Sequence, residues 1–121
     1  MAFPGTYNIS YYKGDTLEFR VYPKDSTGDP FNLENYTTSF TISNARGSDG
    51  AANQINAYSI ISEDGLYILC AIRPATDGAQ LNAGTTYVYD VEISKTATPY
   101  PFVYTVLTGN ITVTDQVTGA T

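Results

Sequence analysis

The acidic side chains are the residues of this sequence best placed to do chemistry. Asp90 and Glu92 lie two positions apart on one face of a predicted strand, and Glu63 and Asp64 are adjacent in a predicted turn. Two carboxyl groups can hydrolyse a glycosidic bond when they flank a cleft and one of them has a raised pKa. A small β-domain rarely offers such a cleft, so we interpret both pairs as solvated positions of a strand and a turn.

The sequence excludes most other catalytic and metal chemistry. It contains no histidine, which removes the Ser-His-Asp triad, the Cys-His pair and the usual zinc sites. Cys70, the single cysteine, lies in the middle of an apolar strand pattern and is expected to be a small buried hydrophobe. Asp25, Thr27 and Asp29 resemble alternating oxygen ligands, but no closing acidic residue follows at the distance a calcium loop needs. We expect no enzyme activity, no cofactor and no metal.

The composition limits the class of protein further. The chain has 121 residues, a net charge of −6, and only 15% charged residues, whereas 11 of its residues are tyrosine. The six basic residues are scattered, so no nucleic-acid partner is expected. No stretch approaches 18 apolar residues and the first residues lack the features of a signal peptide, so neither a membrane span nor secretion is expected. One cysteine permits no internal disulfide, which suits a reducing compartment.

Period-2 alternation of apolar and polar residues predicts an all-β fold. It is clearest over residues 16–22, 37–44, 66–73 and 85–94, with further strands expected over 6–12, 55–61, 102–107 and 110–114. Leu66 is expected on the buried face of its strand, and Gly109 at a bulge or bend. One helical turn is possible within residues 74–84. Seven or eight short strands separated by turns favour an immunoglobulin-like antiparallel β-sandwich, with a closed barrel as the second choice. We expect one domain over residues 1–121, with an N-terminal arm at 1–5 and a C-terminal tail at 115–121.

Exposed tyrosine and an apolar arm point to a protein interface. Tyrosine presents a large contact area with few rotatable bonds, and a surface poor in charge suits a protein packed against neighbours. Loops 45–53 and 95–101 and the tail are further candidates. The predicted interface residues are Met1, Ala2, Phe3, Pro4, Tyr12, Tyr22, Tyr100 and Pro101. An exposed tyrosine surface could alternatively bind carbohydrate.

The order of turns and strands resembles small immunoglobulin-like modules of tailed-bacteriophage virion proteins, such as the N-terminal modules of baseplate upper proteins. The most specific part is Tyr87-Val88-Tyr89-Asp90-Val91-Glu92-Ile93, followed by a final strand led by Gly109. The remaining matching segments are Gly14-Asp15-Thr16 before an alternating strand, the turn from Asp25 to Pro30, Leu33, Tyr36, Ala83-Gly84-Thr85 and Val117-Thr118. Asn32, Glu34 and Asn35 depart from the family pattern, and Tyr100-Pro101 lengthens the last hairpin loop.

The resemblance implies a structural or adaptor role without enzyme activity. The protein would be made in the host bacterial cytoplasm and assembled into the virion as a homo-oligomer, in contact with other virion structural proteins of the tail, baseplate or neck. Three alternatives remain: a decoration or cement protein of the capsid, a receptor- or carbohydrate-binding module, and a small hydrolase that uses a carboxylate pair.

Overall fold

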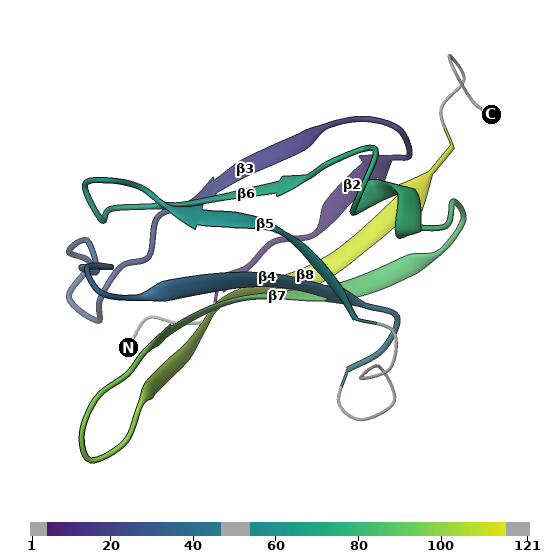
Figure 1. Ribbon diagram of the computed structural model, residues 1–121. Coiled ribbons are helices and arrows are strands. Elements are labelled where there is room, and N and C mark those ends of the chain that lie inside the picture. The colour runs from purple at the N-terminus through teal and green to yellow at the C-terminus, as the bar shows by residue number, and fades with distance from the viewer. Residues whose placement is uncertain (1–4, 47–53, 116–121) are drawn as a thin grey trace.

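The computed structural model describes residues 5–46 and 54–115 of the chain, which form strands and one short 3-10 helix (Figure 1). The elements are β1 (Gly5–Thr6), β2 (Ile9–Tyr12), β3 (Leu17–Val21), β4 (Thr37–Ser43), β5 (Ile55–Ile61), β6 (Ile68–Ile72), η3 (Gly78–Gln80), β7 (Thr86–Lys95) and β8 (Phe102–Thr114). The all-β class predicted from the sequence is confirmed. No helix within the described ranges is both long and apolar enough to cross a membrane.

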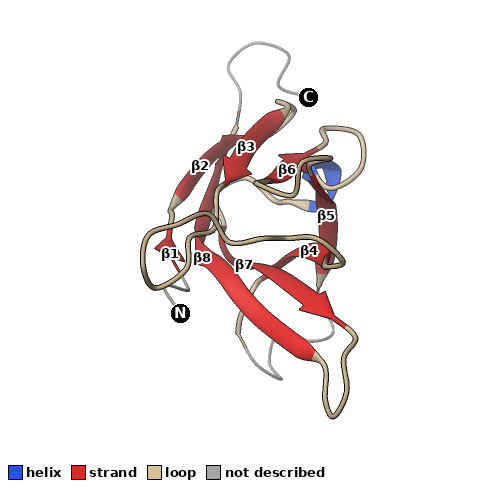
Figure 2. Ribbon diagram, turned by 90° about the vertical axis from the view of Figure 1, so that its left-hand side faces the viewer, coloured by secondary structure: helices blue, strands red, loops and turns tan. Residues whose placement is uncertain are grey.

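The strands form one curled sheet in the order β1-β8-β7-β4-β5-β6-β3, with β2 also paired to β8. The curl arises at β5, whose Ile55–Ala57 half pairs with β4 and whose Tyr58–Ile61 half pairs with β6. This change of partner folds β6 and β3 back over β4, β7 and β8, as Figures 1 and 2 show. Apolar side chains from both halves of the sheet therefore face each other.

The expectation of a purely antiparallel sheet is wrong at the N-terminus. Both β1 and β2 run parallel to β8, with Gly5 opposite Leu107 and Ile9 opposite Ile111. The strand expected over residues 6–12 is also interrupted, because two polar bonds bind the Tyr7–Asn8 segment to neighbouring strands. The Tyr89 hydroxyl donates to the Tyr7 carbonyl, and the Asn110 N–H donates to Asn8 Oδ1 at 3.1 Å. Burial raises the pKa of the Tyr89 hydroxyl, which keeps it protonated as a donor.

Three aromatic rings join the two halves of the sheet, of which Phe40 and Tyr89 are fully buried and Phe19 is partly buried. Phe19 of β3 lies 5.5 Å from Phe40 of β4 and 6.4 Å from Tyr89 of β7, and Phe40 and Tyr89 are 5.5 Å apart, all in edge-to-face geometry. Edge-to-face ring pairs add to the stabilisation gained from burial alone. The predicted inward face of the late strand is confirmed, since its members are almost fully buried: Tyr87, Tyr89, Val91 and Ile93.

Two local predictions need correction. Leu66 was expected on the buried face of its strand, but it is 44% exposed because β6 begins only at Ile68. The Leu66 N–H instead donates to Ser62 Oγ within the preceding turn. Gly109 makes no bulge or bend in β8. The irregularity falls between Val91 and Glu92 of β7, opposite Val106.

The turn between β6 and β7 is held by a buried carboxylate. Asp77 is 2% exposed, and its Oδ2 accepts from the Arg73 backbone N–H at 3.1 Å and from Arg73 Nε at 2.9 Å. Arg73 Nη2 donates to Oδ1 at 2.8 Å. Burial alone would raise the pKa of Asp77, but the hydrogen bonds from Arg73 outweigh it and hold that pKa below its usual value. The helical turn expected here is present as η3, directly after Asp77.

Replacing Asp77 by asparagine is expected to lower the free energy of unfolding at pH 7 by about 1.5–3 kcal/mol, as for hydrogen bonds to charged groups. A carboxyl with a lowered folded-state pKa stabilises the protein above its unfolded-state pKa of about 3.9 and loses that effect as the pH falls. The deficit of Asp77→Asn should therefore shrink between pH 7 and pH 3 in urea unfolding. Glu63→Gln, at an exposed turn position, is the control. An equal deficit at both pH values would contradict this account.

Candidate functional site

A strip of aromatic rings runs along the β7–β8 hairpin and onto the loop before β4. Tyr100 lies 6.0 Å from Phe102, and the Phe102 and Tyr104 rings stack at 6.3 Å with an interplanar angle of 11°. Phe31 continues the row, 6.2 Å from Tyr104 and 5.6 Å from Tyr36. We call these five residues the aromatic strip. The hairpin that carries its outer end projects from the body of the sheet (Figures 1 and 2).

The aromatic strip is exposed at its outer end, at Tyr100, and is poor in charge. Tyr100 is 62% exposed, and Phe102 and Tyr104 are half-buried. Residues 96–114, which include β8, contain no Asp, Glu, Lys or Arg. The cation at the strip is Lys95, whose Nζ lies 5.0 Å from the centre of the Tyr36 ring and 5.8 Å from that of Phe102. A cation at this distance from two ring faces is attracted to both, which favours the observed arrangement of Tyr36 and Phe102.

The structure places the interface residues predicted from the sequence at separate positions. Tyr100 and Pro101 belong to the exposed tip of the β7–β8 hairpin. Tyr12 is 53% exposed but pairs with Thr114 at the other end of β8. Since β8 has 13 residues, Tyr12 and Phe102 are about 40 Å apart along the strand. Tyr22 is 52% exposed and lies just after β3, 5.4 Å from Tyr67. Met1, Ala2, Phe3 and Pro4 lie outside the described residues, as do most of loop 45–53 and the tail beyond Asp115.

Sequence reasoning missed four of the five rings of the aromatic strip: Phe31, Tyr36, Phe102 and Tyr104. Lys95 was included only as the first residue of the candidate loop 95–101. Phe31 and Tyr36 lie in an irregular segment that makes the turn Leu33–Tyr36, where the Tyr36 N–H donates to the Leu33 carbonyl at 3.1 Å. They reach β8 only because that loop folds across the hairpin. The aromatic residues of this segment could have indicated a site. However, the alternation of apolar and polar residues does not predict which strand a residue outside the strands will contact.

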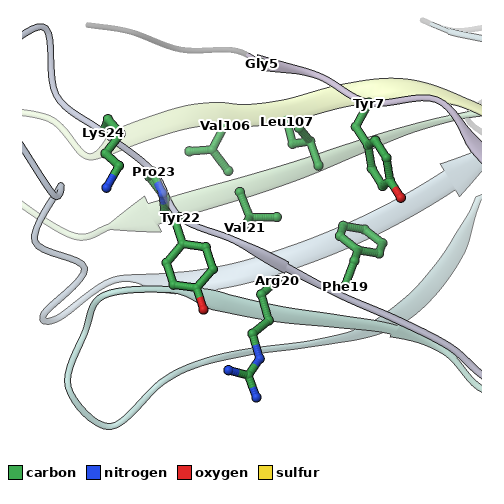
Figure 3. A pocket seen from close by; sticks show the side chains of 10 residues that line it. All are labelled: Gly5, Tyr7, Phe19, Arg20, Val21, Tyr22, Pro23, Lys24, Val106 and Leu107. Carbon is green, nitrogen blue, oxygen red and sulfur yellow. The ribbon is translucent and has the colours of Figure 1, made fainter. Parts of the chain in front are cut away.

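A groove lies between β3 and the paired strands β1 and β8 (Figure 3). It encloses about 530 Å³ and is lined mainly by apolar groups, among them Phe19, Val21, Val106 and Leu107. Arg20 and Lys24 are its charged members. The Arg20 side chain extends away from Leu107 in Figure 3, and its guanidinium lies 4.8 Å from the centre of the Tyr67 ring. The groove interior is thus an apolar surface between two strands.

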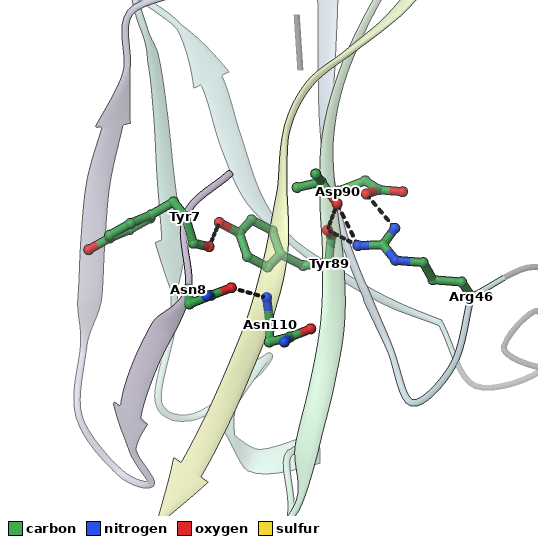
Figure 4. A network of polar contacts seen from close by, with 7 residues as sticks. Tyr7, Asn8, Arg46, Tyr89, Asp90 and Asn110 are labelled. Atoms are coloured by element: carbon green, nitrogen blue, oxygen red, sulfur yellow. Dashed lines mark hydrogen bonds and ion pairs between the residues drawn. The ribbon is translucent and has the colours of Figure 1, made fainter. Parts of the chain in front are cut away.

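Two of the four acidic residues considered for catalysis, Asp90 and Asp64, have structural partners. Asp90 accepts from Arg46 Nη1 at 2.8 Å, while Arg46 also donates to the Tyr89 carbonyl and to Thr108 Oγ1 (Figure 4). Both members of this ion pair are largely exposed, so it contributes little stability. Asp64 Oδ1 accepts from Ser62 Oγ, and this bond lowers the pKa of Asp64. These bonds hold Asp90 on its strand and Asp64 in its turn, the positions interpreted from the sequence.

The Asp25–Asp29 segment forms a turn closed by its first carboxylate. Asp25 Oδ1 accepts from the Thr27 backbone N–H at 2.9 Å, from Thr27 Oγ1 at 2.6 Å and from the Asp29 N–H at 3.1 Å. The Thr27 hydroxyl is the main cause of the lowered pKa of Asp25. This carboxylate oxygen therefore stabilises the turn with hydrogen bonds.

Cys70 is fully buried, as predicted, and burial raises the pKa of its thiol to about 12. Because the thiolate is the reactive form, the native protein should react with a thiol reagent such as DTNB at pH 8 at least about 100-fold more slowly than the unfolded chain. The measurement is the absorbance time course with and without denaturant, on a chain that has no other cysteine. Rapid labelling without denaturant would contradict the buried position.

Comparison of the sequence with known proteins gives no family assignment. No protein-family model matches the chain, and a search of curated proteins found no similar sequence.

Proposed function

We propose that this protein is a non-enzymatic structural component of a bacteriophage virion that acts through protein–protein contacts in the tail, baseplate or neck. The observation that carries the proposal is the aromatic strip, a row of mutually packed rings whose outer ring, Tyr100, is exposed and whose strand β8 has no charged residue. The virion and its location come from the resemblance to phage modules. In this proposal the chain is made in the bacterial cytoplasm and assembles as a homo-oligomer with other virion proteins.

The chemistry of the strip suits a protein partner. Interface cores are enriched in aromatic residues and depleted in charge, and a few buried aromatic anchors carry most of the binding energy. The strip offers Tyr100 and Phe102 at its outer end, where a partner can cover them completely. Rings already held by Lys95 and by one another lose little rotamer entropy on binding.

We further propose that the curled sheet is an immunoglobulin-like sandwich. Such sandwiches place strands B, E and D in one sheet and C, F and G in the other. The order β3-β6-β5 matches the first set and β4-β7-β8 matches the second. The Tyr87 hydroxyl accepts from the Asn82 N–H at 2.9 Å, near the start of β7, in the manner of a tyrosine corner. The Phe19, Phe40 and Tyr89 rings occupy the strands that hold the Cys, Trp and Cys of antibody domains.

A carbohydrate- or receptor-binding module is the second candidate. It is favoured by the nearly parallel Phe102 and Tyr104 rings, because flat aromatic faces can stack on sugars. This candidate predicts saturable glycan binding by the isolated protein, which the structural role does not require. Titration against a glycan array, with Tyr100→Ser as the control, separates the two.

The test of the virion proposal is to purify the particles that contain this chain and locate it in them. Cross-linking mass spectrometry on density-purified particles should show cross-links from Lys95 to itself in another copy or to tail, baseplate or neck proteins. Cross-links confined to the major capsid protein would instead assign the chain to capsid decoration. A chain that is absent from particles and strictly monomeric would overturn the proposal.

A further inference from the structure

The layer formed by β3, β6 and β5 has an inner face that packs on the core and an outer face that points away from it. Figure 1 shows this layer above β4, β7 and β8. Phe19, Cys70 and Ile72 belong to its inner face. Since successive side chains of a strand alternate between faces, Glu18 and Arg20 of β3 point outward, and both are exposed.

The strand register arranges the outer face in two rows that cross the strands. Glu18 is paired with Ala71 of β6, and Arg20 is paired with Leu69. Ile60 of β5 extends the second row, because it is paired with Leu69 and is 49% exposed. The first row thus combines a carboxylate with a small side chain. The second row combines a guanidinium with larger apolar side chains.

The border of the first row is already occupied by groups of the same chain. The Arg73 guanidinium lies 5.6 Å from the centre of the Tyr58 ring and covers that side chain. Arg73 is in turn paired with Asp77, with Nη2 2.8 Å from Oδ1. The charges that the two rows offer to a partner are therefore those of Glu18 and Arg20.

The two rows are complementary to a second copy of themselves. A two-fold axis that crosses the strands midway between the rows places each row over the other row of the second copy. Glu18 then faces Arg20 of the second copy, Arg20 faces its Glu18, and the pairing is reciprocal, as an isologous contact requires. The same axis places Leu69 against the small side chain of Ala71. Among the described residues Glu18 forms no hydrogen bond or ion pair, so its carboxylate is available.

We propose that the outer face of β3, β6 and β5 is a two-fold contact between two copies of this chain, held by reciprocal Glu18–Arg20 ion pairs and by packing of Leu69 on Ala71. The inference gives the proposed homo-oligomer a location and rests on that part of the proposed function. The three strands span two strand spacings, about 10 Å, whereas a standard interface covers about 800 Å² on each partner. We therefore expect a weak dimer, with a dissociation constant on the order of 100 μM.

Charge reversal in the isolated full-length chain tests the contact by sedimentation velocity between about 10 μM and 1 mM. Glu18→Arg places arginine opposite arginine at both pairs, and Arg20→Glu places carboxylate opposite carboxylate, so each should raise the dissociation constant at least about tenfold. An equimolar mixture of these two variants restores a Glu–Arg pair at both positions and should dimerise like the wild type. The control is Tyr58→Ser, at the covered border, which should leave the dissociation constant unchanged.

Three results would overturn the proposal. One is a wild-type chain that stays monomeric up to about 1 mM. The second is a dimer that survives both single reversals, and the third is a mixture that fails to recover the dimer although circular dichroism shows both variants folded. A chain that is found in particles but is monomeric in solution would overturn this contact alone, so its failure is distinguishable from a failure of the virion proposal.

Discussion

Replacing Phe40 by alanine should lower the free energy of unfolding by about 3–5 kcal/mol, the range for large-to-small changes at buried phenylalanines. Phe40 is 1% exposed and contacts both Phe19 and Tyr89 at 5.5 Å, so its removal leaves two rings facing a void. β3, β4 and β7 each contribute one ring, and the change weakens the contact between the two halves of the curled sheet. For a domain whose total stability is about 5–15 kcal/mol, this is a large fraction.

Denaturant unfolding at equilibrium measures the effect. Phe40→Leu is the matched control, because it keeps most of the apolar volume and should cost much less. A loss below about 1 kcal/mol for Phe40→Ala, with an unchanged dependence on denaturant, would show that the three rings do not join the two halves of the sheet.

Replacing Gly109 by alanine should lower the free energy of unfolding by about 1–3 kcal/mol or more, the range found when a packed site is overfilled. A β-carbon on Gly109 would collide with the backbone carbonyl of Tyr7, which the Tyr89 hydroxyl holds in place. The collision involves backbone rather than the end of a flexible side chain, so it can be relieved only by moving the Tyr7–Asn8 segment away from β8.

Hydrogen exchange locates this effect. The Tyr7 N–H donates to the Thr108 carbonyl at 2.9 Å, and its exchange should accelerate in Gly109→Ala more than that of β7 amides. Asn110→Ala is the control, because position 110 is exposed and retains its backbone N–H. Unchanged protection of Tyr7 in Gly109→Ala would contradict the close approach.

The sequence predicted those parts of the fold that depend on local alternation. In β7 the apolar and polar positions follow one another without interruption, and the structure buries Tyr87, Tyr89, Val91 and Ile93 as expected. The burial of Cys70 follows from the same reasoning. Alternation reports which face is buried, but it contains no information on which strand lies alongside.

Long-range pairing therefore escaped prediction. The parallel contact of β1 and β2 with β8 joins residues about a hundred positions apart, and Gly109 is needed there for close approach rather than for a bend. The candidate site shows the same limit. Tyr100 was identified by its own type, whereas Phe31 and Tyr36 belong to the site only because a loop folds across the hairpin. Tyr12 was predicted as an interface residue, like Tyr100, only because it is a tyrosine. The structure places it at the opposite end of β8.

In the proposed function, the aromatic strip forms the contact with neighbouring virion proteins. The most direct measurement is competitive incorporation, in which tagged wild-type and variant chains are co-expressed during particle assembly and counted in purified particles by mass spectrometry. Tyr100→Ser and Tyr100→Ser with Phe102→Ser are compared with Tyr58→Ser, an exposed tyrosine on β5, and all variants are checked for folding by circular dichroism. The account predicts at least about tenfold lower incorporation of both strip variants, the factor given by about 1.4 kcal/mol of lost binding. Equal incorporation of folded strip variants and the Tyr58→Ser control would contradict it.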